Sequence, residues 1–299
     1  MHILSANDLT FDNINKIFSI ADQIRLGKTF KVKKFLTLFF EKPSTRTRLS
    51  FEAAIARLGG LSSYVDPSTT HRIRGESIED TSRIIGMYSD FIAARLYEHK
   101  DIETMAKYSS AQVINALTDL EHPTQALSDI YTMKRYKKLK DSKLVFIGDI
   151  ATNTANSLII LASKFNISMS LVGPKDYNPN NSIIKIAEEN NKNFNIDITD
   201  SIKEGLKGAD FIYTDTFVSM GEERDAEKRK KMFAPYQLNS EVLNNAPSAK
   251  IMHCLPAHRG EEITSDVLDG KQSIVWEQAM NKLIINEALL IFLSKSNKK

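Results

Sequence analysis

The stretch FLTLFFEKPSTRTRLSFEAAIARLGG, residues 35–60, decides how the chain folds. It begins with a short apolar run at 35–40, which predicts a buried β-strand. A charged pair and a proline at 41–43 break this strand. Apolar residues then recur between 51 and 58 at the i, i+3, i+4, i+7 spacing of an amphipathic helix, and the glycines at 59–60 end that helix.

The same strand-then-helix pattern recurs along the chain. Such alternation predicts an α/β fold in which mainly parallel sheets are flanked by helices. A helix is expected over 182–190, and further strands are expected at 91–96, 112–116, 143–147, 168–172, 194–198, 210–214 and 250–254.

A chain of 299 residues is long enough for two domains, at roughly 100–200 residues each. The boundary is expected in a helix at about 123–140, just before the strand at 143–147. We therefore expect a first domain of residues 1–135, joined by the C-terminal helix residues 283–299, and a second domain of residues 136–282. The last helix is expected over 278–294, and the sequence allows it to pack back on the first domain.

Composition excludes several classes of protein. No apolar run reaches the roughly 18 residues of a membrane span, and residues 1–5 lack the pattern of a signal peptide. The single cysteine, Cys254, excludes an intrachain disulfide and fits a reducing compartment, so we expect a cytoplasmic protein without a membrane partner. A net charge of +3 is too small to indicate nucleic-acid binding. The basic run at 134–138 is expected to be a solvated helix end or linker.

Ser44, Thr45, Arg46 and Thr47 fall at the start of the helix that follows the first strand. Free backbone N–H groups and the helix dipole favour an anion at that position. A simple N-cap would explain one hydroxyl. Three hydroxyls interleaved with two arginines, Arg46 and Arg48, indicate a phosphate site, because guanidinium groups match phosphate geometry.

Two further groups could act on a carbonyl. His122 and Gln125 open another helix, with a proline in its first turn, and Arg95 ends the strand expected at 91–96. Donors of this kind polarise a carbonyl on which an oxyanion develops. Taken alone, His122 could equally be a surface or cap residue, and Arg95 a strand-end ion pair.

In the second half of the chain, polar residues follow strands. Asp215 ends one strand, Cys254 ends another, and Asn153 lies near the start of a helix, where an ordinary cap is an equally good explanation. Residues 146–149, Phe-Ile-Gly-Asp, lack the second and third glycines of a dinucleotide fingerprint, so NAD binding is rejected.

Residues 40–52 resemble the carbamoyl phosphate signature of the aspartate and ornithine carbamoyltransferase family. The His-Pro-x-Gln motif at 122–125, the Asp-x-x-x-Ser-Met-Gly motif at 215–221 and His-Cys-Leu-Pro at 253–256 extend the likeness over about residues 2–293. The last two motifs resemble the ornithine branch. The resemblance implies carbamoyl transfer from carbamoyl phosphate to the δ-amine of L-ornithine, giving L-citrulline and phosphate, with closure of the two domains on ligand binding as a hypothesis.

The resemblance also implies the site residues. Carbamoyl phosphate is expected to contact Ser44, Thr45, Arg46, Thr47, His71, Arg95, His122, Gln125, Cys254, Leu255 and Lys282. Ornithine is expected to contact Asn153, Asp215, Ser219 and Met220. Catalytic roles fall to Arg46, Arg95, His122, Asp215 and Cys254, where Cys254 would orient or deprotonate the amine without a covalent intermediate.

No metal or organic cofactor is implied, and the expected assembly is a homotrimer or a multiple of trimers that share active sites. His71 stands where many members carry a glutamine that reaches a neighbouring subunit's site. Lys282 stands where the family usually has an arginine, which keeps the charge but loses the bidentate fork. The alternatives are a carbamoyltransferase for another amine, such as putrescine or an acylated ornithine, and a non-catalytic ligand-sensing homologue.

Overall fold

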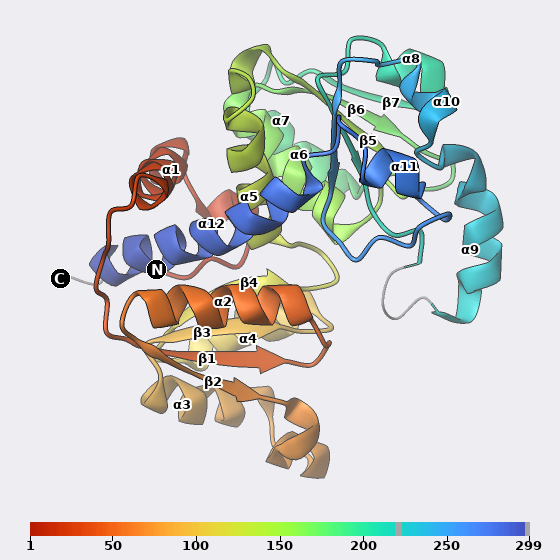
Figure 1. Cartoon of the computed structure of the whole chain (residues 1–299). Helices are drawn as coiled ribbons and strands as arrows, with labels where there is room; N and C mark the ends of the chain where they lie inside the picture. Colours follow the sequence, from red (N-terminus) through yellow and green to blue (C-terminus); the bar gives the residue numbers. More distant parts are fainter. Residues whose placement is uncertain (219–222, 297–299) are drawn as a thin grey trace. The chain divides into compact units, whose positions relative to one another are not determined.

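The structure is a computed structural model that describes residues 1–218 and 223–296 (Figure 1). The chain divides into two compact units. Unit 1 comprises Met1–Tyr131 and Met280–Lys299, and unit 2 comprises Thr132–Ala279. The limits placed from the sequence were residues 135 and 282. None of the helices that the structure describes has the length and apolar character needed to cross a bilayer.

Unit 1 is built on a four-stranded parallel sheet with the strand order β2-β1-β3-β4. The strands are β1 (Phe35–Phe40), β2 (Leu61–Val65), β3 (Phe91–Arg95) and β4 (Gln112–Leu117). The helices that begin in this unit are α1 (Phe11–Arg25), α2 (Thr45–Arg57), α3 (Ile78–Tyr88), α4 (His99–Tyr108) and α5 (Pro123–Lys134).

Unit 2 is built on a five-stranded parallel sheet with the strand order β7-β6-β5-β8-β9. The strands are β5 (Lys143–Ile147), β6 (Ser168–Val172), β7 (Ile196–Thr199), β8 (Phe211–Thr214) and β9 (Lys250–His253). Its helices include α6 (Asn153–Phe165), α7 (Asn181–Asn190), α8 (Ile202–Leu206), α9 (Ala226–Phe233), α10 (Ser240–Leu243) and α11 (Ser265–Leu268). Two parallel sheets with helices confirm the predicted fold class.

Every strand that the sequence predicted is present, with ends shifted by at most two residues; β7 begins at Ile196 instead of residue 194. The prediction missed β2, which pairs with β1 at the edge of the sheet. Its sequence, LSSYV, has no fully buried side chain, so it lacks the apolar signal of the other strands. The helix expected over 123–140 is shorter, since α5 ends at Lys134 and a separate 3-10 turn follows at Leu139–Asp141.

The apolar positions of α2 justify the pattern that predicted it. Phe51, Ala54, Ile55 and Leu58 are all completely buried. Full burial of a phenylalanine, leucine or isoleucine side chain contributes about 1.5–3 kcal/mol to the free energy of folding. This apolar face therefore fixes the helix and its N-terminus against the core of unit 1.

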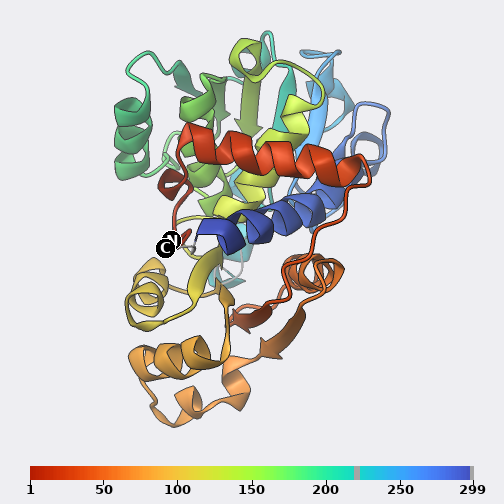
Figure 2. The same ribbon diagram turned by 90° about the vertical axis from the view of Figure 1, so that its left-hand side faces the viewer.

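The long helix α12 (Val275–Ser296) runs from unit 2 into unit 1. Within unit 1 its residues lie alongside α1, as Figure 2 shows for the blue and red helices, and Arg25 Nη1 donates to Asn281 Oδ1 at 2.7 Å. Asn286 Nδ2 also donates to Ser50 Oγ of α2 at 2.8 Å. The expected return of the last helix to the first domain is therefore confirmed.

In both sheets the first strand lies in the interior, and the order in which later strands are added along the sheet reverses beside it. In unit 1 the reversal lies between β1 and β3, and in unit 2 it lies between β5 and β8. Ligands of α/β proteins bind outside the carboxyl ends of the strands at such a switch point. The segments after β1, β3, β5 and β8 are therefore the places to look for a site.

Candidate active site

The N-terminus of α2 is open to a ligand. Ser44 occupies the N-cap position, yet its side chain makes no capping hydrogen bond, and its backbone oxygen accepts the first helical bond from Arg48 N at 3.2 Å. The N–H groups of the first helical turn have no partner within an α-helix. Thr45, Arg46 and Thr47 form this turn, so the capping explanation of these hydroxyls is not supported.

Three side chains from distant parts of unit 1 meet beside this turn. Lys282 Nζ, from α12, donates to Thr47 Oγ1 at 3.0 Å and to Gln125 Oε1 at 2.7 Å. Lys282 is only 6% exposed. A desolvated ammonium group interacts with an anion far more strongly than a surface lysine does. The structure thus unites the first motif, the second motif and the residue that departs from the family pattern.

His122 and Arg95 belong to the same part of unit 1, and both are buried. Burial lowers the pKa of His122 well below its usual value, and the positive charges of Lys282 and Arg95 lower it further. The imidazole is therefore neutral near pH 7. A neutral imidazole can still donate one N–H bond, which is what polarisation of a carbonyl requires.

Gln125 is oriented by Asp129, a residue outside the predicted site. Its Nε2 donates to Asp129 Oδ1 at 2.8 Å, one turn further along α5, and Asp129 is completely buried. Because a carboxylate only accepts, the amide nitrogen faces Asp129 and the amide oxygen faces Lys282. The i, i+4 spacing of 125 and 129 within the predicted helix was the available signal.

His71 does not join this cluster. It begins a short 3-10 helix, His71–Arg74, and its side chain is exposed. No hydrogen bond or ion pair connects that side chain with any residue that the structure describes. Arg72, next in sequence, instead pairs with Glu41 at 3.3 Å.

In unit 2, the predicted site residues follow β5, β8 and β9. Cys254 Sγ donates to Asp215 Oδ1 at 2.8 Å, so these two meet directly. Both are half-buried. Asn153 is the first residue of α6, but the N-cap is Thr152, whose hydroxyl accepts from Ala155 N. The cap explanation of Asn153 is therefore wrong.

The turn after β9 is held by His253. Its Nδ1 accepts from Leu255 N at 2.8 Å, its Nε2 lies 3.1 Å from Glu262 Oε1, and its own N–H donates to Gln278 Oε1 at 2.9 Å. Leu255 adopts a positive φ of 59°, a conformation that a leucine rarely takes without such support. Cys254 and Leu255 are thus presented by a fixed backbone.

Asp215, His253 and Cys254 have potential metal-ligand atoms within 4.8 Å of one another. The thiol, however, is engaged with Asp215, and both ring nitrogens of His253 are engaged as described above. These contacts favour organic-substrate binding over metal binding at the three residues.

Ser219 and Met220, predicted to bind ornithine, lie outside the described residues. The strand end before them is well held. Arg229 of α9 donates from Nε to Phe217 O at 2.8 Å and also pairs with the buried carboxylate of Asp149. Neither Arg229 nor Asp149 was predicted, because their contact joins segments 80 residues apart.

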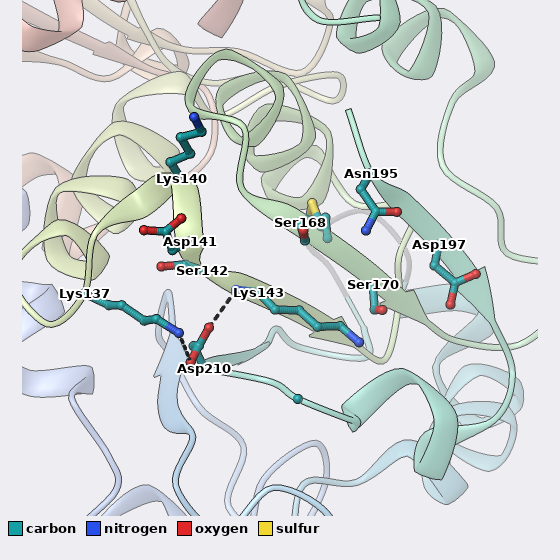
Figure 3. A pocket seen from close by; sticks show the side chains of 12 residues that line it. Lys137, Lys140, Asp141, Ser142, Lys143, Ser168, Ser170, Asn195, Asp197 and Asp210 are labelled. Atoms are coloured by element: carbon teal, nitrogen blue, oxygen red, sulfur yellow. Dashed lines mark hydrogen bonds and ion pairs between the residues drawn. The ribbon is translucent and has the colours of Figure 1, made fainter. Parts of the chain in front are cut away.

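A polar hollow of about 550 Å³ lies at the opposite, amino-terminal edge of the unit 2 sheet (Figure 3). Lys137 pairs there with Asp210 at 2.7 Å, and Asp210 also accepts from Lys143 N at 2.8 Å. Lysines and aspartates are equal in number around it, and no predicted site residue lines it. We assign the hollow no part in the reaction.

Comparison with known proteins identifies the family. A family model described as aspartate/ornithine carbamoyltransferase, carbamoyl-P binding domain, matches residues 1–135, and one described as the Asp/Orn binding domain matches residues 140–293. The chain belongs to the aspartate/ornithine carbamoyltransferase family.

Individual members of the family are similar to this chain over almost its whole length. An ornithine carbamoyltransferase from Pyrococcus abyssi is 42% identical and covers 97% of this chain and 95% of its own. The structure of ornithine carbamoyltransferase from Pyrococcus furiosus has a TM-score of 0.93 at 40% identity, covering 99% and 98%. The anabolic ornithine carbamoyltransferase from Campylobacter jejuni has a TM-score of 0.91 at 34% identity, covering 99% of each chain.

Proposed function

We propose that this protein transfers the carbamoyl group from carbamoyl phosphate to the δ-amine of L-ornithine, forming L-citrulline and phosphate. The family and the names of its relatives support this reaction. The observation that carries it is the meeting of Thr47, Gln125 and Lys282 at the N-terminus of α2. A cation, a hydroxyl and an amide gathered at a helix start suit a small phosphorylated substrate.

The phosphate of carbamoyl phosphate would lie on the first turn of α2. Backbone N–H groups and the hydroxyls of Ser44, Thr45 and Thr47 would donate to its oxygens, and Arg46 and Lys282 would supply positive charge. As the phosphate leaves, its growing charge would be stabilised by groups that are already in place.

The carbamoyl carbonyl would be polarised by Arg95 and His122. Because His122 is neutral, it would donate a hydrogen bond without adding a third full charge to those of Arg95 and Lys282. Gln125, with its orientation fixed by Asp129, would contact the carbamoyl amide group. His71, exposed within its own protomer, would reach the site of a neighbouring subunit.

Ornithine would bind on unit 2. Asp215, Asn153, Ser219 and Met220 would hold its amino-acid end, where the Asp215 carboxylate can pair with an ammonium group. Since an amine attacks only when it is unprotonated, a proton must leave the δ-ammonium group first. Cys254, which donates to Asp215, would orient that amine or accept the proton. The amine would attack the carbamoyl carbon directly, and the C–O bond to phosphate would break.

A citrulline assay tests the reaction. The protein is mixed with carbamoyl phosphate and, separately, L-ornithine, putrescine, N-acetylornithine and L-aspartate, and the carbamoylated product is measured. We expect kcat/KM for ornithine to exceed that of every other amine by at least about 100-fold, because an amine without the matching polar groups leaves buried partners in the site unpaired. A comparable rate with another amine would reject ornithine as the acceptor, and no product at all would support the ligand-sensing alternative.

We further propose synthesis of arginine as the metabolic direction and the cytoplasm as the compartment. The relative from Campylobacter jejuni is named anabolic. A single, half-buried cysteine, free of any disulfide, fits a reducing environment.

We also propose a homotrimer or a multiple of trimers. Unit 1 carries large apolar side chains that are exposed on α2, β2, α3 and the 3-10 helix of His71, which is unusual for a monomer. These are Leu49, Leu61, Ile73, Ile84, Met87 and Tyr88, and four of the six are more than 60% exposed. Burial against a neighbouring subunit would cover them and bring His71 to that subunit's site.

Subunit mixing tests both the assembly and the role of His71. A His71→Ala variant and a His122→Asn variant, each weakly active, are unfolded together and refolded as a mixture. Random assembly of trimers with shared sites restores about a quarter of the wild-type sites. Light scattering should give about three times 33.7 kDa or a multiple of that mass. Absence of any recovery would show that His71 acts within its own subunit or not at all.

A further inference from the structure

Three side chains that have no part in the proposed reaction converge on the turn after β9. His258, Glu261 and Glu262 each offer a ligand atom, and these atoms all lie within 4.8 Å of one another. The turn is well fixed: Glu261 N donates to His258 O at 2.9 Å, and Arg259 holds Asp269 with both of its terminal nitrogens. His258 is exposed and Glu261 partly so, which leaves the cluster accessible.

Glu262 supplies the observation that points to a ligand. Its side chain is completely buried, and its two oxygens are in different situations. Oε1 accepts from His258 N at 2.5 Å and faces His253 Nε2 at 3.1 Å. Oε2 has no hydrogen-bond partner among the residues that the structure describes, and it points toward His258 Nδ1, 3.7 Å away.

A buried carboxylate oxygen without a donor is costly. His253 offers Oε2 no donor, because its Nδ1 accepts from Leu255 N and its Nε2 faces Oε1. Lys230 Nζ donates to Glu261 Oε1 at 2.8 Å and makes no hydrogen bond to Glu262 Oε2. A cation placed between Glu262 Oε2 and His258 Nδ1 would satisfy both atoms.

We propose that His258, Glu261 and Glu262 form a binding site for a divalent transition metal of the Zn²⁺ type. One imidazole nitrogen and two carboxylates are a ligand set that such ions accept, whereas Ca²⁺ and Mg²⁺ prefer oxygen ligands throughout. Three protein ligands leave a fourth, solvent-facing position for water. Since Oε2 and Nδ1 are 3.7 Å apart, both can reach one ion at about 2.0–2.2 Å without moving, and a shortening of a few tenths of an ångström would give the tetrahedral angle.

Such a site would be coupled to the reaction, and this consequence rests on the proposed function. Glu262 bridges the cluster to His253, which in turn holds the backbone of Leu255 beside Cys254. A metal on Oε2 would withdraw negative charge from the carboxylate that orients His253. We therefore expect bound metal to change kcat of citrulline formation.

Metal binding itself is tested without reference to activity. The full-length protein, freed of metal by chelation, is titrated with ZnCl₂ by calorimetry, and with CoCl₂ while the visible spectrum is recorded. We expect one ion per chain and the intense visible bands of four-coordinate Co²⁺. In His258→Asn and Glu261→Gln, affinity should fall at least about ten-fold, the smallest loss usual even for outer ligand-supporting residues. Glu241→Gln, which removes an exposed glutamate of unit 2, is the matched control and should bind normally.

The alternative metal cluster provides the decisive comparison. Binding that survives in His258→Asn but is lost in Cys254→Ser, with a cobalt–thiolate charge-transfer band, would place the ion on Asp215, His253 and Cys254 and overturn the proposal. Absence of a stoichiometric ion in the wild type would overturn it too, and would leave His258 and Glu262 as a simple ion pair. Citrulline formation without added metal remains a separate measurement, so failure of the metal site would leave the proposed function intact.

Discussion

Lys282 provides the sharpest test of the carbamoyl phosphate site, through the pair of variants Lys282→Met and Lys282→Arg. Its buried ammonium group lies on Thr47 and Gln125. Loss of a charge-assisted hydrogen bond to the substrate phosphate costs about 1.5–3 kcal/mol. For Lys282→Met this corresponds to a fall in kcat/KM for carbamoyl phosphate of about 10- to 150-fold.

Stability should respond much less than catalysis. Lys282→Met leaves Gln125 Oε1 buried without its donor, which costs about 1–3 kcal/mol. The same change removes a desolvated charge near Arg95, which is favourable and of similar size. The two terms oppose each other, so Tm should change by only a few degrees. Lys282→Arg should keep the charge, add a second donor for phosphate and lower KM.

Steady-state kinetics in carbamoyl phosphate and thermal melting of the same samples measure these effects. If kcat/KM of Lys282→Met stays within about three-fold of wild type while Tm falls, the side chain is structural and the reasoning is wrong. Unchanged kinetics in Lys282→Arg would also count against contact between this side chain and the substrate.

Three further predictions concern groups already described. Burial and positive neighbours lower the pKa of His122 below its usual 6.5, so the unfolded chain binds a proton more readily than the folded chain. The stability that results is present above about pH 6.5 and is lost as pH falls toward the folded pKa. His122→Asn should therefore flatten the acid side of a Tm–pH curve, and curves identical to wild type would contradict this reasoning. Cys254→Ser keeps a donor to Asp215, so kcat should fall by about 10-fold or less. Asp215→Asn should lose about 100-fold or more in kcat/KM for ornithine. A loss of activity in Cys254→Ser as large as that in Asp215→Asn would give the thiol a larger role. Asp129→Leu frees the Gln125 amide to rotate and should raise KM for carbamoyl phosphate by about 10-fold. Asp129→Asn keeps an oxygen acceptor and should have a KM close to that of wild type. Equal KM values for the two variants would make Asp129 purely structural.

Local periodicity was sufficient to find most of the fold. The buried strands and α2 can be recognised from the sequence, because their apolar side chains face one core and the spacing of these side chains follows from backbone geometry. The edge strand β2 was missed since only its pairing with β1, not its own composition, makes it a strand. Helix α5 ends at Lys134, although the basic run continues to residue 138. The distribution of charge therefore could not locate the end of this helix.

The site divides in the same way. The start of α2 could be deduced as a phosphate site from its own residues. That Lys282 reaches Thr47 and Gln125 could not, because a contact across 235 residues has no local signal, and only the family resemblance suggested it. Asp129 could have been found from its spacing to Gln125, whereas Glu262 is defined solely by the turn that buries it.

The path of α12 bears on how this protein is made. Most of unit 1 precedes unit 2 along the chain, but Lys282 and Asn286 of α12 are synthesised 235 and 236 residues after Thr47 and Ser50, their partners in α2. Domains usually fold in order of synthesis. Here the earlier unit must wait for a helix that is made after all of unit 2, with Ser50, Thr47 and Gln125 lacking their partners from α12 throughout elongation. A nascent chain stalled before residue 280 should therefore hold a protease-sensitive first unit beside a second unit that is already resistant.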